Sequence, residues 1–170
     1  MKTKIASILL ILCLLGAALA ACTPHTDYFE PFRGAFAAEI EGTLNGEAFT
    51  ALIQAQAAPA EGESRRVTVT FYAPEGLRGT EARQDADGRI TLSSGEVSVE
   101  DARADGLRAL FDLFPLTGEV SGVELTDQGH TRLTGEGFSL TFLSDGTPLI
   151  AQAPAVTANV VRFERVREPQ

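Results

Sequence analysis

The dipeptide Asn45-Gly46 is the feature of this sequence that most constrains its fold. Two stretches in which apolar and polar residues alternate, "AFAAEIEGTL" and "EAFTALIQAQ", lie on either side of it. A type I′ turn needs positive φ at both central residues, and Asn-Gly meets this need more readily than almost any other pair. We therefore expect an antiparallel hairpin with a two-residue turn.

That turn also sets the register of the hairpin and assigns each side chain to a face. It pairs Gly42 with Phe49, so the apolar residues of both strands share one face, namely Phe36, Ile40, Phe49 and Ile53. The other face carries Glu39, Glu41, Thr50, Gln54 and Gln56. A slip by one residue would bury the two glutamates, which costs more than the pairing returns. We expect the apolar face to contact the core.

Short strands separated by turn residues continue along the chain. Val67, Val69 and Phe71 alternate with polar residues before the turns "APEGLRG" and "DADGR". "GEVSGVEL" and "HTRLTGEG" then lead to a strand from which Phe138, Leu140 and Phe142 point inward, followed by an Asp145-Gly146 turn. A two-residue loop there would place Phe142 opposite Leu149 and Leu140 opposite Ala151. A last strand is expected over 160–166, with Val161 and Phe163 in the core.

One amphipathic helix interrupts the strands. In "EDARADGLRALFDLFPL" the residues Leu107, Leu110, Phe111 and Phe114 follow the spacing i, i+3, i+4, i+7, and Pro115 ends the pattern. Arg108 and Asp112 then face outward. Together these patterns predict one mainly β domain of the α+β class over residues 35–167. We expect an antiparallel sheet with the helix across its concave face.

The first 21 residues have the features of an export signal. Lys2 and Lys4 precede an apolar stretch over 5–15 and a small-residue tail over 16–21. The sequence Leu19-Ala20-Ala21-Cys22 resembles the bacterial lipobox, which implies a diacylglycerol on Cys22 and a tether over residues 22–34. Two or three acyl chains, at about 0.8 kcal/mol per buried methylene, form a stable anchor. The alternative is an ordinary secretory signal in which the cysteine is incidental.

The lipobox resemblance implies an address. It places the chain on the extracytoplasmic side of the cell membrane, and Thr23 in place of an aspartate implies the outer membrane where the organism has one. Removal of the leader also removes Cys13, so Cys22 is the single remaining cysteine and no disulfide is available. The fold must then be held by packing and hydrogen bonds.

Charge excludes one class of partner. The net charge is −9 for the whole chain and becomes −11 without the two leader lysines, because the chain then has 12 arginines and 23 acidic residues. Such a surface repels phosphate backbones and anionic headgroups. We therefore expect no nucleic-acid partner, and we expect lipid rather than a basic patch to hold the chain at the membrane.

The order of the elements resembles a known superfamily. The hairpin, "VTFYAPEGLRG", "DGRITL", the helix and "GEGFSLTFLSDGTPLIA" are together similar to the Lol-type lipoprotein-carrier superfamily, in particular to half-barrel lipoproteins of spore-forming bacteria. The resemblance covers most of residues 35–165. It implies a strongly curved half-barrel whose concave side holds acyl chains in the carriers and is core in other members. This chain is shorter, has one long helix and is anchored, which implies reception, binding or scaffolding rather than shuttling.

Residues typical of catalysis or metal binding are sparse. His25 and His130 are the only histidines, and no serine lies in a nucleophile-elbow context, so we expect no enzyme. One acylated cysteine and two separated histidines do not make a zinc site. The Asp85-x-Asp87-Gly88 set is similar to part of a calcium loop, but it lacks the glutamate at the twelfth position, and we expect a hairpin turn. The only cofactor we expect is the covalent lipid on Cys22.

Two functions remain. The first is a membrane-anchored scaffold or partner-binding lipoprotein of the cell envelope without catalysis. The alternative is a binding protein for an acyl chain or another apolar ligand in a half-barrel cavity. One set of residues is plain core in the first function and ligand lining in the second: Phe36, Ile40, Phe49, Ile53, Phe71, Phe111, Phe114, Phe138 and Phe142. Small residues such as Ala38 and Gly42 fit either tight packing or room for a ligand.

Overall fold

The fold is known from a computed structural model that describes residues 27–59, 63–100 and 105–166. The expected leader, the lipobox and Cys22 lie outside these ranges. Among the described residues, no helix has the length and apolar character needed to cross a bilayer.

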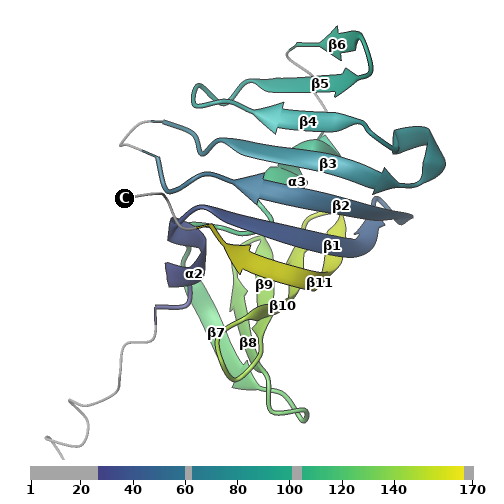
Figure 1. The fold of residues 1–170 in the computed structure, drawn as a ribbon. Helices are drawn as coiled ribbons and strands as arrows, with labels where there is room; N and C mark the ends of the chain where they lie inside the picture. Colours follow the sequence, from purple (N-terminus) through teal and green to yellow (C-terminus); the bar gives the residue numbers. More distant parts are fainter. Residues whose placement is uncertain (1–26, 60–62, 101–104, 167–170) are drawn as a thin grey trace, which may run out of the picture.

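Two antiparallel meanders build the sheet (Figure 1). The first comprises β1 (Phe36–Leu44), β2 (Glu47–Ala55), β3 (Val67–Ala73), β4 (Glu81–Gln84), β5 (Ile90–Ser94) and β6 (Val97–Val99). The second comprises β7 (Val120–Leu125), β8 (Thr131–Gly135), β9 (Phe138–Phe142), β10 (Pro148–Ala153) and β11 (Val156–Arg165). They join where β1 pairs with β11, which gives one 11-stranded sheet in the order β6-β5-β4-β3-β2-β1-β11-β10-β9-β8-β7.

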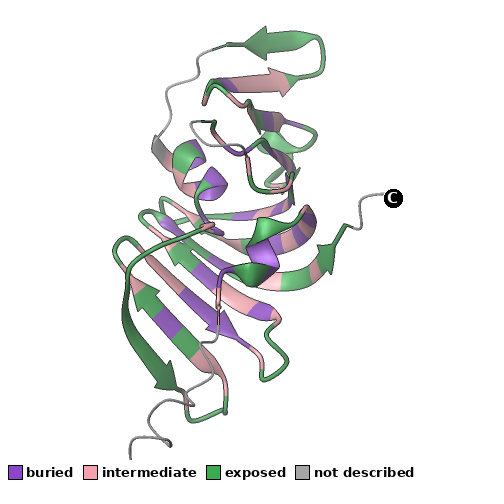
Figure 2. Cartoon of the chain, turned by 90° about the vertical axis from the view of Figure 1, so that its left-hand side faces the viewer, coloured by how far each residue is buried: buried purple, intermediate pink, exposed green. Residues whose placement is uncertain are grey.

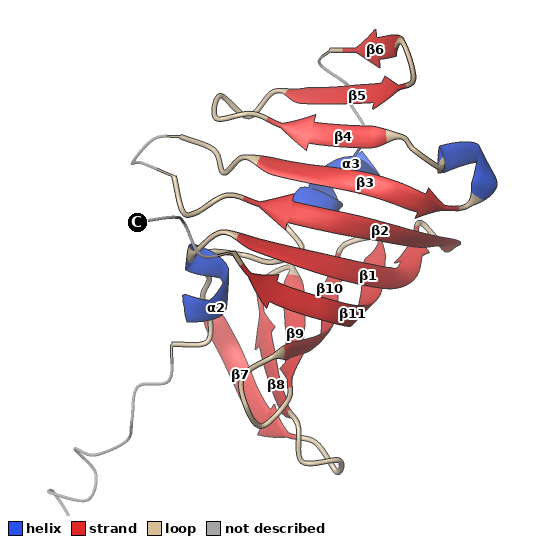
Figure 3. Ribbon diagram, in the orientation of Figure 1, coloured by secondary structure: helices blue, strands red, loops and turns tan. Residues whose placement is uncertain are grey.

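The sheet is strongly curved and open, and helices are few (Figure 3). In the described part of the chain, the α-helices α2 (Glu30–Arg33) and α3 (Asp105–Phe111) and the 3₁₀ helix η1 (Glu75–Leu77) accompany the strands. Between β6 and β7 the chain must pass from one edge of the sheet to the other, and α3 lies on that path, in contact with β3 and β11. The expected fold class, a curved antiparallel sheet with a helix on its concave face, is confirmed.

The first hairpin forms as the sequence predicts. Asn45 and Gly46 have φ of 53° and 87°, as a type I′ turn requires. Gly42 pairs with Phe49, and the register continues without a break to the pair of Phe36 with Ala55. The four residues of the predicted apolar face, Phe36, Ile40, Phe49 and Ile53, are at most 4% exposed.

The helix ends earlier than its apolar pattern suggests. Its last residue is Phe111, and the amide of Leu113 donates to the carbonyl of Leu110 at 3.4 Å, which closes a tighter turn. Phe114, expected as the last member of the helical stripe, therefore lies beyond the helix, although it is buried. Pro115, which cannot continue a helix, follows directly.

The pairing across the β9–β10 turn differs from expectation. Leu140 does lie opposite Ala151, but Phe142 lies opposite Pro148 rather than Leu149. The reason is a longer loop, in which the amide of Leu143 donates to the carbonyl of Thr147 at 2.9 Å, so the chain reverses over Ser144 to Gly146. The ladder then shifts between Pro148 and Ile150.

The last strand is also longer than expected, since β11 begins at Val156. Glu39 pairs with Arg162 and Ile40 with Val160, so Val161 has no partner and forms a bulge. Its side chain is 58% exposed, and the expectation of Val161 in the core was wrong. Phe163, which follows this bulge, packs against the core as expected.

Candidate functional site

An aromatic cluster covers the sheet where α2, β1 and β11 meet. The ring of Phe32 lies within 5.2–6.1 Å, centroid to centroid, of the rings of Phe36, Phe114, Phe142 and Phe163. Phe36 is also 5.4 Å from Phe114 and 5.1 Å from Phe163. Edge-on and tilted rings at these distances are typical of packed cores. In Figure 2 the buried residues lie along the strands and on the helix surfaces that face them.

The structure places the nine predicted core-or-lining residues in or against this core. Phe36, Ile40, Phe49, Ile53, Phe71, Phe111, Phe114 and Phe142 are at most 6% exposed, and Phe138 is partly buried against the same cluster. Phe32 is not among these nine, although it is 0% exposed and central to the cluster. The sequence indicates only that Tyr28, Phe29 and Phe32 are too apolar for a free tether and pack onto the edge of the domain, and all three do contact the core.

The small residue Gly42 reflects tight packing and not space for a ligand. A Cβ at this position would lie 2.0 Å from the carbonyl oxygen of Thr157 and 2.7 Å from the Cα of Ala158. Both atoms belong to the backbone of β11, so β1 and β11 approach one another too closely for any side chain. Glycine inside a strand commonly marks such an approach or a sharp bend of the sheet.

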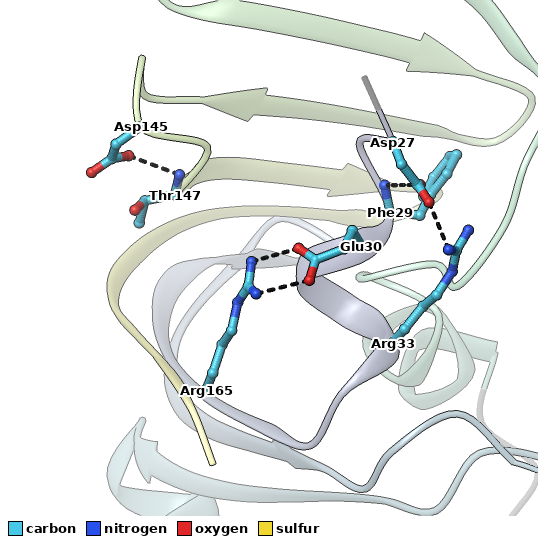
Figure 4. Close-up of polar contacts among 7 residues, drawn as sticks. All are labelled: Asp27, Phe29, Glu30, Arg33, Asp145, Thr147 and Arg165. Atoms are coloured by element: carbon cyan, nitrogen blue, oxygen red, sulfur yellow. Dashed lines mark hydrogen bonds and ion pairs between the residues drawn. The ribbon is translucent and has the colours of Figure 1, made fainter. Parts of the chain in front are cut away.

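The segment before β1 is clamped to the rest of the domain (Figure 4). Arg165 on β11 holds the carboxylate of Glu30 with two contacts, at 3.0 and 2.7 Å. Within the segment, Arg33 lies 2.6 Å from Asp27, and a carboxylate oxygen of Asp27 accepts from the amide of Phe29 at 3.2 Å. These ion pairs are exposed and contribute little free energy singly. They join residues 27–33, which lie within the expected tether, to one another and to β11.

A groove of about 920 Å³ lies beside α3. Arg108, Ala109 and Asp112 of the helix form one wall. The opposite side consists of chain reversals, with Glu136 from the β8–β9 turn, Phe138 at the start of β9, and Pro154 and Ala155 from the β10–β11 turn. Pro115, Gly118 and Glu119 close the end that leads to β7. The lining is thus a mixture of small apolar residues and charged residues.

Two glycines leave room for the Phe138 ring beside this groove. Gly135 pairs with Phe138 across the β8–β9 hairpin, and a Cβ on Gly135 would lie 2.2 Å from the Phe138 ring. A Cβ on Gly118 would lie 2.7 Å from the same ring. The ring therefore occupies space that a side chain at either position would need, and its centroid lies 5.9 Å from that of the Phe29 ring in an edge-on arrangement. Phe138 is the one predicted residue that lines this groove.

Acidic groups dominate the electrostatics of the groove. Asp112, Glu119 and Glu136 line it, against one basic residue, Arg108. Partial burial raises the pKa of the Asp112 carboxyl, and the charge of Arg108 acts in the opposite direction. A bound cationic group would compensate these carboxylates better than a neutral or anionic one.

A second groove, of about 730 Å³, lies at the far end of β1–β4 and is more polar. Gln54, Arg66 and Arg83 contribute to it, together with the edge of Phe36. Its charges are partly compensated, since Arg89 lies 3.0 Å from Asp87 and Arg83 lies 3.9 Å from Glu81. We therefore take the groove beside α3 as the candidate site.

His130 lies in a turn, where its backbone is hydrogen-bonded. It closes the β7–β8 turn, where its amide donates to the Thr126 hydroxyl at 3.1 Å and its carbonyl accepts from the Thr126 amide at 2.8 Å. The Asp85-x-Asp87-Gly88 set forms a hairpin turn as expected, with Gly88 at φ 77°. Within the described ranges, no three His, Cys, Asp or Glu side chains gather in a way that could hold a metal. His25 lies outside these ranges.

Known proteins resemble this chain in structure more than in sequence. No family model and no curated protein matches it. An uncharacterized conserved protein from Thermus thermophilus superposes with a TM-score of 0.51 at 17% identity, over 82% of this chain and 83% of that one. This chain shares its fold. At such low identity the likeness says nothing further about function.

Two other structures align less closely. MucB gives a TM-score of 0.47 at 16% identity over 85% of this chain. MucB in the complex of Pseudomonas aeruginosa MucA and MucB gives 0.43 at 20% identity over 84% of this chain. The chain spans 59% and 56% of those two chains, so it corresponds to about half of each.

Proposed function

We propose that this chain is a non-catalytic lipoprotein of the cell envelope, anchored through Cys22, that binds an extended segment of a partner protein in the groove beside α3. One observation carries the proposal. Aromatic rings pack against one another over the concave face, whereas the groove beside α3 is open, about 920 Å³ in volume and lined by half-buried and exposed side chains. Binding at this site requires no rearrangement of the core.

The lining indicates the chemistry of the partner segment. Ala109, Pro115 and Pro154 offer apolar contact without long side chains that would have to be ordered. Asp112 and Glu136 favour a lysine or arginine on the bound segment. The occupant we expect is thus an extended peptide with small apolar residues and at least one positive charge.

The alternative, an acyl chain held among the predicted aromatic residues, has less support. It needs space between rings such as Phe36 and Phe114, which lie 5.4 Å apart, or a movement of α3 away from the sheet. Phe49, Ile53 and Phe71 line neither of the two large grooves. An acyl chain in the groove beside α3 would also meet three carboxylates.

Photo-crosslinking in the native host tests the proposal. Benzoylphenylalanine replaces Ala109 in the groove and, as a matched control, Tyr72, which is 43% exposed on β3. We expect an adduct with the mass of a polypeptide from position 109 and none from position 72. Charge reversal by Asp112→Lys with Glu136→Lys should reduce its yield. An adduct with the mass of a fatty acid or phospholipid would favour the alternative, and equal labelling at both positions would contradict a specific site.

A further inference from the structure

The outer edge of β7 is a second surface suited to binding. Among the strands of residues 27–59, 63–100 and 105–166, β7 is the last of the sheet and pairs with β8 on one side only (Figure 1). All six of its residues, Val120 to Leu125, are exposed. An edge strand presents a row of unpaired N–H and C=O groups to which another strand can bind. The opposite edge of the sheet, β6, has three residues and offers a much shorter row.

The apolar face of the core continues onto this edge. Val123 lies opposite Leu133 on β8, which in turn lies opposite Leu140 on β9. Leu133 and Leu140 are 0% exposed, but Val123 is 52% exposed. Leu125, opposite Thr131 and on the same face, is 74% exposed. A further strand paired with β7 would cover Val123 and Leu125, which are the outermost apolar side chains on this face of the sheet.

The usual protections against strand addition are weak here. Natural edges are blocked by lysine, proline, a bulge or a very short strand. β7 contains no lysine or proline, and its ladder shifts only near its start, between Val120 and Gly122. From Gly122 to Leu125 the pairing with β8 is regular, which leaves an ordered stretch of edge.

Charge decides what kind of strand this edge accepts. Glu119, Glu124 and Asp127 follow one another along the edge, and residues 118–131 contain no lysine or arginine. Glu124 pairs with Arg132 of β8 at 3.1 Å, and the other two are exposed. Two copies of β7 side by side would bring six carboxylates to one seam, and like charges across strands are destabilising. A strand with basic residues fits, and a second copy of this chain does not.

We propose that β7 binds an extended segment of another protein in which apolar and basic residues alternate. Apolar side chains of that segment would lie beside Val123 and Leu125 and continue the concave face. Its basic side chains would lie on the other face, beside Glu124. Main-chain hydrogen bonds supply affinity in such strand addition, and the alternate side chains supply specificity. This surface lies outside the groove beside α3 except at Glu119, so the two proposals can fail separately.

The test uses the chain without its leader, residues 22–170, with Cys22→Ser to prevent acylation. The probe is an end-blocked octapeptide of alternating valine and arginine, and the control peptide alternates valine and glutamate. We expect the probe to slow hydrogen exchange of β7 amides and the control peptide not to. Val123→Lys should weaken probe binding by about tenfold or more, because it puts a charge against the valines and repels the arginines. Val97→Lys, on the opposite edge, should change nothing.

Other results would overturn the proposal. Probe binding that Val123→Lys leaves unchanged, or exchange protection confined to the groove beside α3, would exclude β7 as the site. A dimer of the free chain that Val123→Lys dissociates would identify a second copy as the occupant. If Val123→Lys perturbs the fold, Leu125→Lys, at the more exposed position, replaces it and is tested in the same way. A variant counts as folded if hydrogen exchange of the strands other than β7 is unchanged.

Discussion

The guanidinium of Arg65 lies 4.7 Å from the ring centroid of Phe36, with both residues buried in the core. The same group donates to the carbonyls of Phe32 and Gly34 and, at 2.9 Å, to that of Gln56. Its partners in the described part of the chain are carbonyl oxygens rather than carboxylates, and burial lowers its pKa to about 10. One arginine thus ties the segment before β1 to the end of β2 and the start of β3.

Replacing Arg65 should destabilise the domain strongly. Arg65→Met keeps the apolar stem but leaves three carbonyls without their donor, and an orphaned buried acceptor costs about 1–3 kcal/mol. Removal of a desolvated charge offsets part of this loss. We expect a decrease of about 3 kcal/mol in the free energy of unfolding, measured in urea. Arg66→Ala, one residue further and exposed, should change it by less than about 0.5 kcal/mol. Equal effects of the two variants would contradict the role of Arg65.

Phe32 should prove part of the folding unit. Phe32→Ala is expected to cost about 3–5 kcal/mol, as for other buried aromatic residues. A chain that begins at Ala35, the domain boundary expected from sequence, should lose still more because it also lacks α2. Tyr72→Ala, at an exposed position, serves as the control. Thermal unfolding monitored by circular dichroism measures all three, and a stable chain from residue 35 would restore the boundary at that position.

Gly42→Ala should disturb the junction of the two meanders. The new methyl group would meet the Thr157 carbonyl and the Ala158 backbone, neither of which can move without parting β1 from β11. Overpacking of this kind costs about 1–3 kcal/mol or more. Gly122→Ala, where a Cβ meets no atom within 4 Å, should be nearly neutral. The midpoints of urea unfolding of the two variants test this prediction. A lower midpoint for Gly122→Ala than for Gly42→Ala would contradict it.

Ala155→Gly should stabilise the domain. Ala155 has a φ of 67°, a left-handed conformation that costs a residue with a Cβ about 1–2 kcal/mol. The greater chain entropy of glycine in the unfolded state removes about 0.5–1 kcal/mol of that gain. We expect a net increase of about 0.5–1 kcal/mol in urea unfolding. Ala153→Gly, at an ordinary strand position of β10, should decrease stability, so the two substitutions should have opposite signs.

Asp112 should make stability depend on pH in the acidic range. Because partial burial raises its pKa in the folded state, the protonated form is favoured there. Its contribution is fully present below the unfolded pKa of about 3.9 and is lost as pH rises through the folded value. Asp112→Asn should therefore be slightly more stable than the natural chain at pH 7 and equal to it near pH 3. A stability difference that grows on acidification would refute this assignment.

The candidate site could be anticipated only in part. Arg108 and Asp112 were expected to face outward from the helix, and both line the groove. The opposite wall consists of turn residues such as Glu136 and Pro154, which have no periodicity of their own. The β8–β9 and β10–β11 turns share one end of the meander, as alternate hairpin turns do. Their position beside α3 depends on the curvature of the sheet, and no local pattern reports that curvature.

What the sequence determined by itself is the local geometry. Asn45-Gly46 permits one turn type, and the alternation around it admits one register, so the hairpin follows without knowledge of the rest. The apolar spacing of Leu107, Leu110 and Phe111 likewise specifies a helix with one buried face. Both signals act between residues close in the chain, where backbone sterics and burial favour the same answer.

The tertiary structure alone decided how distant segments meet. Pairing of β1 with β11 joins residues more than a hundred positions apart, and the close approach at Gly42 and the bulge at Val161 adjust the two strands to the curvature of the sheet. The same closure brings Phe32 onto Phe36 and Phe163 and fills space that the sequence left open to a ligand. Packing density is a property of all contacting side chains together, so no stretch of sequence could distinguish core from cavity.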